Sequence, residues 1–164
     1  MRSTRVLLVA LLTGLTLIAT AVTLTLASPA SNVTPTLLSR ATFEEFKAMS
    51  DPDNGGLFKV EAKSDIDVVV RQHTYLAGAH TGWHAHPYPV LITVKEGTLT
   101  FYEYDDPSCT PIVVSAGEGY VDSGRGHIAR NETAAPATDI SIIMAPVGAA
   151  FRAELTAPNP HCGF

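Results

Sequence analysis

From residue 57 onward, hydrophobic and polar residues tend to alternate, which is the period of a strand with one buried face. Turns rich in Gly, Pro and Asp separate the short apolar runs. Eight or so short strands at this spacing predict an all-β sandwich or barrel, and they argue against alternating βαβ units. The expected strands are residues 57–62, 66–77, 91–94, 98–104, 110–114, 119–121, 127–131 and 139–146.

The residues before this repeat predict a linker followed by a short helix. Residues 31–39 are rich in Ser, Thr and Pro, a composition typical of linkers. Thr42 and Glu45 stand three positions apart, as in a capping box, so we expect one short helix from Thr42 to about Met49. The turn residues of 51–56 should end it.

The first residues have the pattern of a secretory signal. Arg2 and Arg5 precede 22 uncharged residues, 6–27, and small residues such as Ala30 follow. The uncharged run is also long enough to be an uncleaved membrane anchor, and both interpretations place the folded domain outside the cytoplasm. We therefore divide the chain into a signal peptide or anchor (1–30), a linker with a short helix (31–56), a barrel (57–150) and an irregular C-terminal tail (151–164).

Charge and cysteine content narrow the possible partners and the compartment. Of the eleven Lys and Arg, two lie in the signal, which leaves nine against sixteen Asp and Glu. No basic run remains, so nucleic acid is not an expected partner, and contact with a membrane is expected only through an uncleaved N-terminal segment. The two cysteines, Cys109 and Cys162, are expected to pair in an oxidising compartment; the alternative is two free thiols.

Two histidine segments carry the candidate chemistry. His84 and His86 are two residues apart, so on a strand both imidazoles point to the same side. Gly78, His84, His86 and Gly97 stand at the spacings of the first motif of the cupin superfamily, and Gly124, His127 and Asn131 fit the second motif. The chain thus resembles a small single-domain cupin over about residues 65–147. This resemblance implies a cupin-type β-barrel, also called a jelly roll or double-stranded β-helix.

The chain departs from the cupin pattern at three positions. Val90 stands where the first motif has its glutamate, and Asp122 stands where the second motif has its proline. The opening glycine of the second motif is one place late, at Gly117. The resemblance therefore implies a metal site of His84, His86 and His127, without the usual carboxylate.

Three further residues are candidates to lie beside this site. His73 shares one side of its expected strand with Tyr75, and that side could face the barrel interior. A hairpin turning at Glu96 and Gly97 would place Glu103 opposite Val90, where it could restore a carboxylate; a solvated position at the rim is the alternative. Tyr88 is a candidate by its closeness to His86 in sequence.

Three histidines can hold one divalent transition metal, and Fe, Zn, Mn, Ni and Cu all suit imidazole. Three protein ligands leave a coordination position open, as in a catalytic or substrate-binding site. Three-histidine iron sites occur in the thiol dioxygenases of the cupin superfamily, so the resemblance implies a secreted, metal-dependent enzyme of dioxygenase type acting on a small molecule. The alternative is a binding or sensory domain without turnover, and the family also suggests a homodimer.

Overall fold

Every regular element of the described chain is a strand, which confirms the all-β prediction. The computed structural model describes residues 29–50 and 56–164, so the predicted signal or anchor lies almost entirely outside the described residues. Within the described ranges, no helix could span a membrane. The strands are β1 (Ser31–Phe43), β2 (Phe46–Met49), β3 (Lys59–Ala62), β4 (Ile66–His80), β5 (His84–Ala85), β6 (Val90–Glu96), β7 (Thr98–Glu103), β8 (Ile112–Ser115), β9 (Gly119–Asp122), β10 (His127–Arg130), β11 (Ala137–Pro146) and β12 (Ala153–Glu154).

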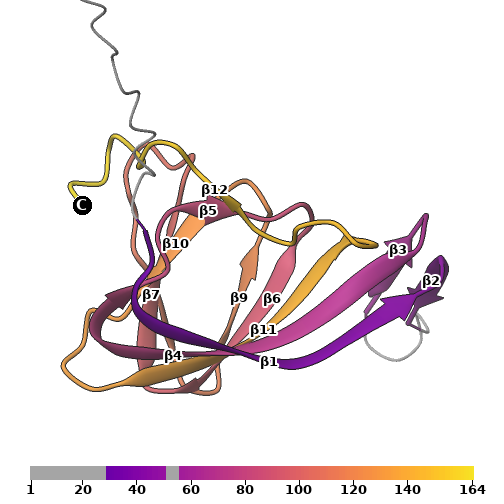
Figure 1. The fold of residues 1–164 in the computed structure, drawn as a ribbon, viewed down its shortest axis with the longest axis horizontal. Coiled ribbons are helices and arrows are strands. Elements are labelled where there is room, and N and C mark those ends of the chain that lie inside the picture. The colour runs from indigo at the N-terminus through magenta and orange to yellow at the C-terminus, as the bar shows by residue number, and fades with distance from the viewer. Residues whose placement is uncertain (1–28, 51–55) are drawn as a thin grey trace, which may run out of the picture.

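All strands except β2 and β3 belong to one curled sheet that nearly closes into a barrel (Figure 1). Its main order is β12-β5-β10-β4-β11-β6-β9, with β1 beside β4 and β7 beside both β10 and β8. Strands far apart in sequence are therefore neighbours, as in the predicted jelly roll. The cupin-type barrel expected from the motifs is confirmed.

The linker predicted over residues 31–39 is instead part of a long edge strand. β1 pairs antiparallel with β4 from Ser31, opposite His80, to Phe43, opposite Ile66. Pro35 is tolerated because β1 has a single partner strand, so its missing N–H can face away from the ladder. Local composition indicated a linker, but pairing with β4 decides the structure, and the barrel begins earlier than residue 57.

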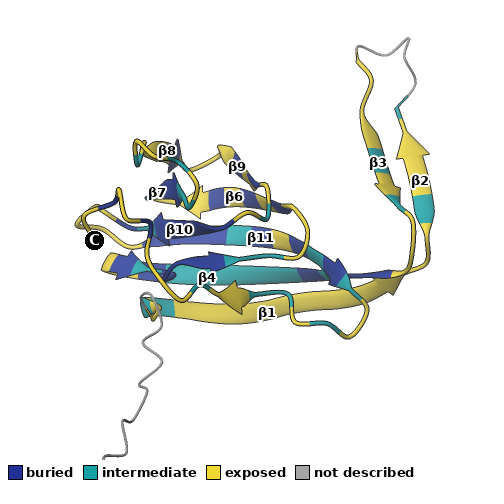
Figure 2. Ribbon diagram, turned by 90° about the horizontal axis from the view of Figure 1, so that it is seen from above, coloured by how far each residue is buried: buried dark blue, intermediate teal, exposed yellow. Residues whose placement is uncertain are grey.

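The short helix predicted from Thr42 to Met49 is also wrong. β1 continues through Phe43, and β2 pairs with β3 in a two-stranded ribbon that extends away from the barrel (Figure 2). The Thr42 hydroxyl donates to the Asp67 carboxylate (2.7 Å) across the β1–β4 pair and caps no helix. An N-cap contributes only about 1 kcal/mol, and the hydroxyl that would supply it bonds across the β1–β4 pair instead.

The predicted hairpin at Glu96 and Gly97 is a corner between different strand pairs. β6 pairs with β11 and β9, whereas β7 pairs with β10 and β8. Gly97 has a φ of 75°, and a Cβ there would lie 2.8 Å from the Pro136 carbonyl oxygen, so only glycine fits this corner. Glu103 consequently does not face Val90; its partner is His127 on β10.

The barrel interior is filled by the inward-facing residues of several strands. Burial alternates along β6, as the period of two predicted, with Val90 and Val94 fully buried. They pack in one cluster with Leu99 and Phe101 of β7 and Val69 of β4. This packing holds the strands that carry the histidines.

The C-terminal tail covers the outer side of β10 and β7. Cys109 and Cys162 form a disulfide, which confirms the predicted pairing. The tail also contributes β12, which pairs with β5, so residues 151–164 are not wholly irregular. Beneath the tail lies a second buried cluster that contains Trp83, whose indole stacks on the Phe164 ring with centroids 6.4 Å apart.

Candidate metal centre

The structure brings the three predicted histidines together from two neighbouring strands. His84 begins β5 and His127 begins β10, and these two residues are direct partners in the antiparallel ladder. His86 follows His84 by two positions and extends the same face. The three ring centroids lie 4.5 to 5.6 Å from one another.

The ligand atoms of the three rings form a group that could hold a single ion. One nitrogen from each ring lies within 4.8 Å of the other two, and the Nε2 atoms of His84 and His127 are 3.1 Å apart. Two nitrogens at about 2.0–2.1 Å from one metal lie roughly 2.9 Å apart at a right angle and roughly 3.4 Å apart at the tetrahedral angle. The 3.1 Å separation of the His84 and His127 Nε2 atoms falls between these two values.

Hydrogen bonds at the opposite ring nitrogens set the tautomer of two histidines. His84 Nδ1–H donates to the Gly82 carbonyl (2.9 Å), and His86 Nδ1–H donates to the Phe151 carbonyl (2.5 Å). A carbonyl oxygen can only accept, so the proton of each neutral ring is on Nδ1 and Nε2 keeps its lone pair. Both side chains are therefore oriented as metal-binding histidines usually are.

The third histidine has a carboxylate at the corresponding place. His127 Nδ1 lies 3.5 Å from Asp122 Oδ1, beyond hydrogen-bond distance, and it has no hydrogen-bond partner among the described residues. Burial raises the pKa of Asp122 to about 6; the Gly124 N–H opposes this shift, and the charge of Glu103 adds to it. Asp122 is thus a buried carboxylate beside His127 Nδ1. The sequence did not reveal this neighbour, because Asp122 was noted only as a departure from the motif.

Burial keeps the histidines in the form that binds metal. His84 and His127 are 3 % and 2 % exposed. Burial first, and then the neighbouring imidazoles and Arg152, holds the pKa of both rings well below the usual value. Burial also lowers the pKa of His86, against the hydrogen bond to Phe151. At neutral pH all three rings are uncharged and can donate a lone pair.

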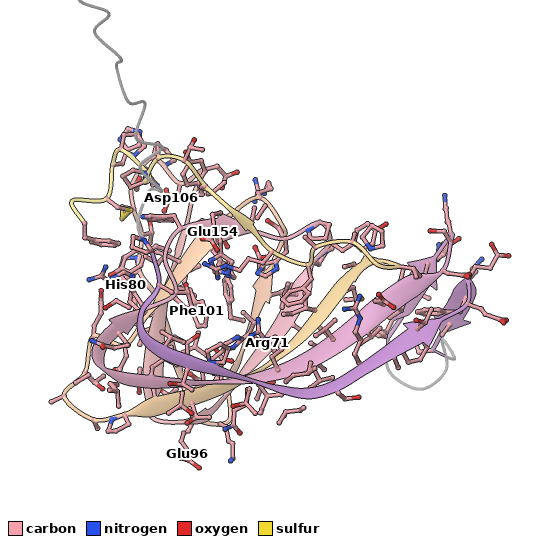
Figure 3. All side chains as sticks on the ribbon, viewed as in Figure 1. Arg71, His80, Glu96, Phe101, Asp106 and Glu154 are labelled. Carbon is pink, nitrogen blue, oxygen red and sulfur yellow. A yellow bond between two sulfur atoms is a disulfide. The ribbon has the colours of Figure 1, made fainter. Side chains whose placement is uncertain are left out.

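The three rings face a cavity of about 190 Å³ inside the barrel. Val90 lines it, so an apolar side chain stands where the cupin motif has a carboxylate. His73 also lines it, as expected for a residue beside the site. Figure 3 draws the described side chains on the ribbon and labels Arg71 and Glu154, both of which line the cavity.

Two predicted neighbours of the site, Glu103 and Tyr88, do not line the cavity. Glu103 does not line the cavity; its Oε1 accepts a hydrogen bond from the Tyr120 hydroxyl (2.6 Å). Glu103 therefore lies beside His127 but does not complete the ligand group. Tyr88 is 36 % exposed and lines a separate hollow that includes Met144, so it does not contribute to the cavity.

Comparison with known proteins finds a match to one family model. Residues 72–143 match the family model of the cupin domain, and this range contains all three histidines. No curated protein matches the chain.

Three solved structures illustrate the likeness. The chain is similar to a conserved double-stranded β-helix protein from Klebsiella pneumoniae (20 % identity, 68 % of this chain and 84 % of that one, TM-score 0.46). It is also similar to the polyketide cyclase RemF from Streptomyces resistomycificus (16 % identity, 76 % and 77 %, TM-score 0.47). A third is the DMSP lyase DddQ from Ruegeria pomeroyi (17 % identity, 52 % and 42 %, TM-score 0.45).

Proposed function

Because residues 72–143 of this chain form a cupin domain, we propose that His84, His86 and His127 hold one divalent transition metal and that the chain is a metal-dependent enzyme. Its substrate is a small molecule that enters the cavity beside the histidines. The reaction class we favour is oxidation of dioxygenase type, and Fe, Zn, Mn, Ni and Cu are the metals to test.

One observation carries this proposal: the Nε2 atoms of His84 and His127 converge while the Nδ1 atoms of His84 and His86 are bound to backbone carbonyls. The tautomer of His84 turns its Nε2 lone pair toward His127 Nε2, 3.1 Å away, in a buried site. A shared ion would use the lone pairs of both nitrogens.

The residues around the ion would determine what it binds. Three neutral ligands leave the charge of a divalent ion uncompensated, since Val90 replaces the carboxylate of the motif. Such an ion, when bound, favours anionic ligands and lowers the pKa of a coordinated water. Three protein ligands also leave at least one coordination position free for a substrate.

His73 is the residue placed to move a proton in the cavity. Its Nδ1–H donates to Asp139 Oδ1 (2.8 Å), so Nε2 is the nitrogen that can accept a proton. Asp139 would stabilise the resulting imidazolium, as a carboxylate does for the histidine of a hydrolase triad. This arrangement supports an enzyme over a domain that only binds its ligand.

We also propose that the domain works outside the cytoplasm. The Cys109–Cys162 disulfide supports this location, because such bonds persist mainly in oxidising compartments. The signal-like pattern of residues 6–27 supports it from the sequence. Expression with a C-terminal tag, followed by fractionation of the cells and the medium, tests it.

Turnover is tested on purified protein reconstituted with each of the five metals. We expect oxygen consumption with Fe(II) and a small organic substrate such as a thiol, and its loss in His127→Ala. Saturable binding of the same substrates with no product under any metal would instead make the chain a binding or sensory domain.

A further inference from the structure

Besides the three histidines, the cavity has a second polar wall, which β4 and β11 form. Alternate residues of β4 lie on one face, and their partners on β11 lie beside them: Arg71 pairs with Ser141, and His73 with Asp139. All four of these residues line the cavity. Arg71 has no role in the metal site or in the proton transfer proposed above.

Asp139 does not neutralise Arg71 through a hydrogen bond. The buried Asp139 carboxylate already accepts from His73 Nδ1 (2.8 Å), the Tyr75 hydroxyl (2.7 Å) and the Ser141 hydroxyl (3.2 Å). These three donors belong to the same wall. The carboxylate therefore has its partners and leaves the guanidinium donors of Arg71 unused.

Arg71 has no hydrogen bond or ion pair with any residue that the structure describes. Its guanidinium carbon lies 5.3 Å from the centre of the Phe151 ring, a cation–π contact that provides no hydrogen-bond acceptor. Burial, followed by the repulsion of Arg152, lowers the pKa of Arg71. The half-buried guanidinium keeps five N–H donors that no described residue accepts from, so they are available to a ligand that enters the cavity.

The neighbouring arginine shows the contrast. Arg152 Nε donates to Glu154 Oε1 (2.5 Å), and its terminal nitrogen donates to Glu154 Oε2 (2.8 Å) and to the Thr81 carbonyl (2.7 Å). Arg152 is therefore paired within the chain. Of these two cavity arginines, Arg71 alone has its donors free for a ligand.

We propose that the cavity binds a small carboxylate anion, whose two oxygens accept hydrogen bonds from the Arg71 guanidinium. The planar fork of arginine matches a carboxylate in a bidentate arrangement. The proposal rests on the proposed function, because it takes this cavity to be the substrate site. It defines the class of substrate as a compact carboxylic acid whose reactive end lies toward the histidines.

The cavity volume limits the size of this acid. A cavity of roughly 150 Å³ holds benzene, which has six non-hydrogen atoms. The cavity of about 190 Å³ thus suits an acid of similar or slightly larger size. Pyruvate has six non-hydrogen atoms, and its amide, pyruvamide, has the same size without the charge.

Titration calorimetry of the purified full chain with these two probes tests the proposal. Each probe is added to protein stripped with a chelator and to Zn(II)-loaded protein, whose metal content is measured separately. We expect saturable binding of pyruvate. Pyruvamide should bind at least roughly tenfold more weakly than pyruvate, because the charge-assisted hydrogen bonds are lost. Inorganic phosphate is a third probe and should bind more weakly than pyruvate.

Variants assign the binding to Arg71. Arg71→Gln should weaken pyruvate binding roughly 10- to 100-fold, and Arg71→Lys, which keeps the charge but loses the fork, should fall between Gln and wild type. Lys95→Gln removes one charge from an exposed position and should bind as wild type does. A thermal melt of each variant verifies folding, and Arg71→Lys serves as the test if Arg71→Gln does not fold.

The proposal fails if pyruvate does not bind, if pyruvamide binds as tightly as pyruvate, if phosphate binds more tightly, or if folded Arg71 variants bind like wild type. These outcomes are separate from the fate of the metal site. Arg71-dependent binding to a chain that takes up no metal would retain the carboxylate site and refute the proposed metal enzyme. Metal uptake together with pyruvate binding that does not depend on Arg71 would retain the proposed metal centre and refute the carboxylate site.

Discussion

Removing the Cys109–Cys162 disulfide should destabilise the fold by about 4 kcal/mol. The bond joins residues 53 apart in sequence, and the chain-entropy model assigns about that free energy to closing a loop of this length. The tail keeps other contacts without the bond: buried Asn159 donates to the carbonyls of Glu103 (3.2 Å) and Asp106 (2.9 Å). We therefore expect a folded but weaker protein.

The measurement is urea unfolding of wild type and of the double variant Cys109→Ala/Cys162→Ala, with the free energy of unfolding extrapolated to water. Reduced wild type is the matched control, because it loses the bond but keeps both sulfur atoms. The double variant and reduced wild type should both melt roughly 10–20 °C below oxidised wild type. A loss below about 1 kcal/mol, at an unchanged denaturant slope, would show that the loop argument does not apply to this tail.

Three further predictions concern the site, the core and the response to acid. Asp122→Asn should lower metal affinity roughly 10- to 100-fold by weakening the orientation of His127, as measured by competition with a chromogenic chelator, while exposed Asp105→Asn should not. Phe101→Ala should cost about 3–5 kcal/mol in urea unfolding, because its fully buried ring packs 4.2 Å from that of Tyr120; a cost below about 1 kcal/mol would contradict the packing described. The Arg40 and Gly148 hydrogen bonds hold the pKa of Asp67 at about 2, below its usual 3.8. The contribution of ionised Asp67 to the free energy of unfolding is therefore full above about pH 4 and is lost as the pH falls toward 2. Asp67→Asn should flatten that part of the stability profile, and an unchanged acid response would refute the assignment.

The sequence predicted the parts of the structure that depend on local period and motif spacing. The strand predicted over residues 91–94 lies within β6, and burial alternates along β6. The spacing of His84 and His86 and the second motif at His127 identified three residues that do converge. The disulfide followed from the cysteine count and from the compartment expected from the N-terminal pattern.

The errors arose where a distant partner strand determines the structure. Thr42 and Glu45 fit a helix cap locally, but pairing of β1 with β4 keeps this segment extended. Gly97 was recognised as a turn residue, yet nothing local shows that the strands on its two sides pair with different partners. Glu103 was therefore placed opposite Val90 when its neighbour is His127.

The polar wall of the cavity was missed for a related reason. Arg71 follows three valines and precedes Gln72, and Asp139 follows Thr138, so alternation of apolar and polar residues does not show which of them face inward. Their pairing across β4 and β11 is visible only in the register of the sheet. His73 was selected as a candidate, but its carboxylate partner, 66 positions away, was not.

Elemental analysis of the purified full chain tests the central claim most directly. Wild type should carry about one transition-metal ion per chain after reconstitution, and His161→Ala, at an exposed histidine of the tail, should carry the same amount. His84→Ala and His127→Ala should retain far less metal. Equal metal content in wild type and in both site variants, or no metal in wild type after exposure to each of the five ions, would contradict a metal centre built by these three histidines.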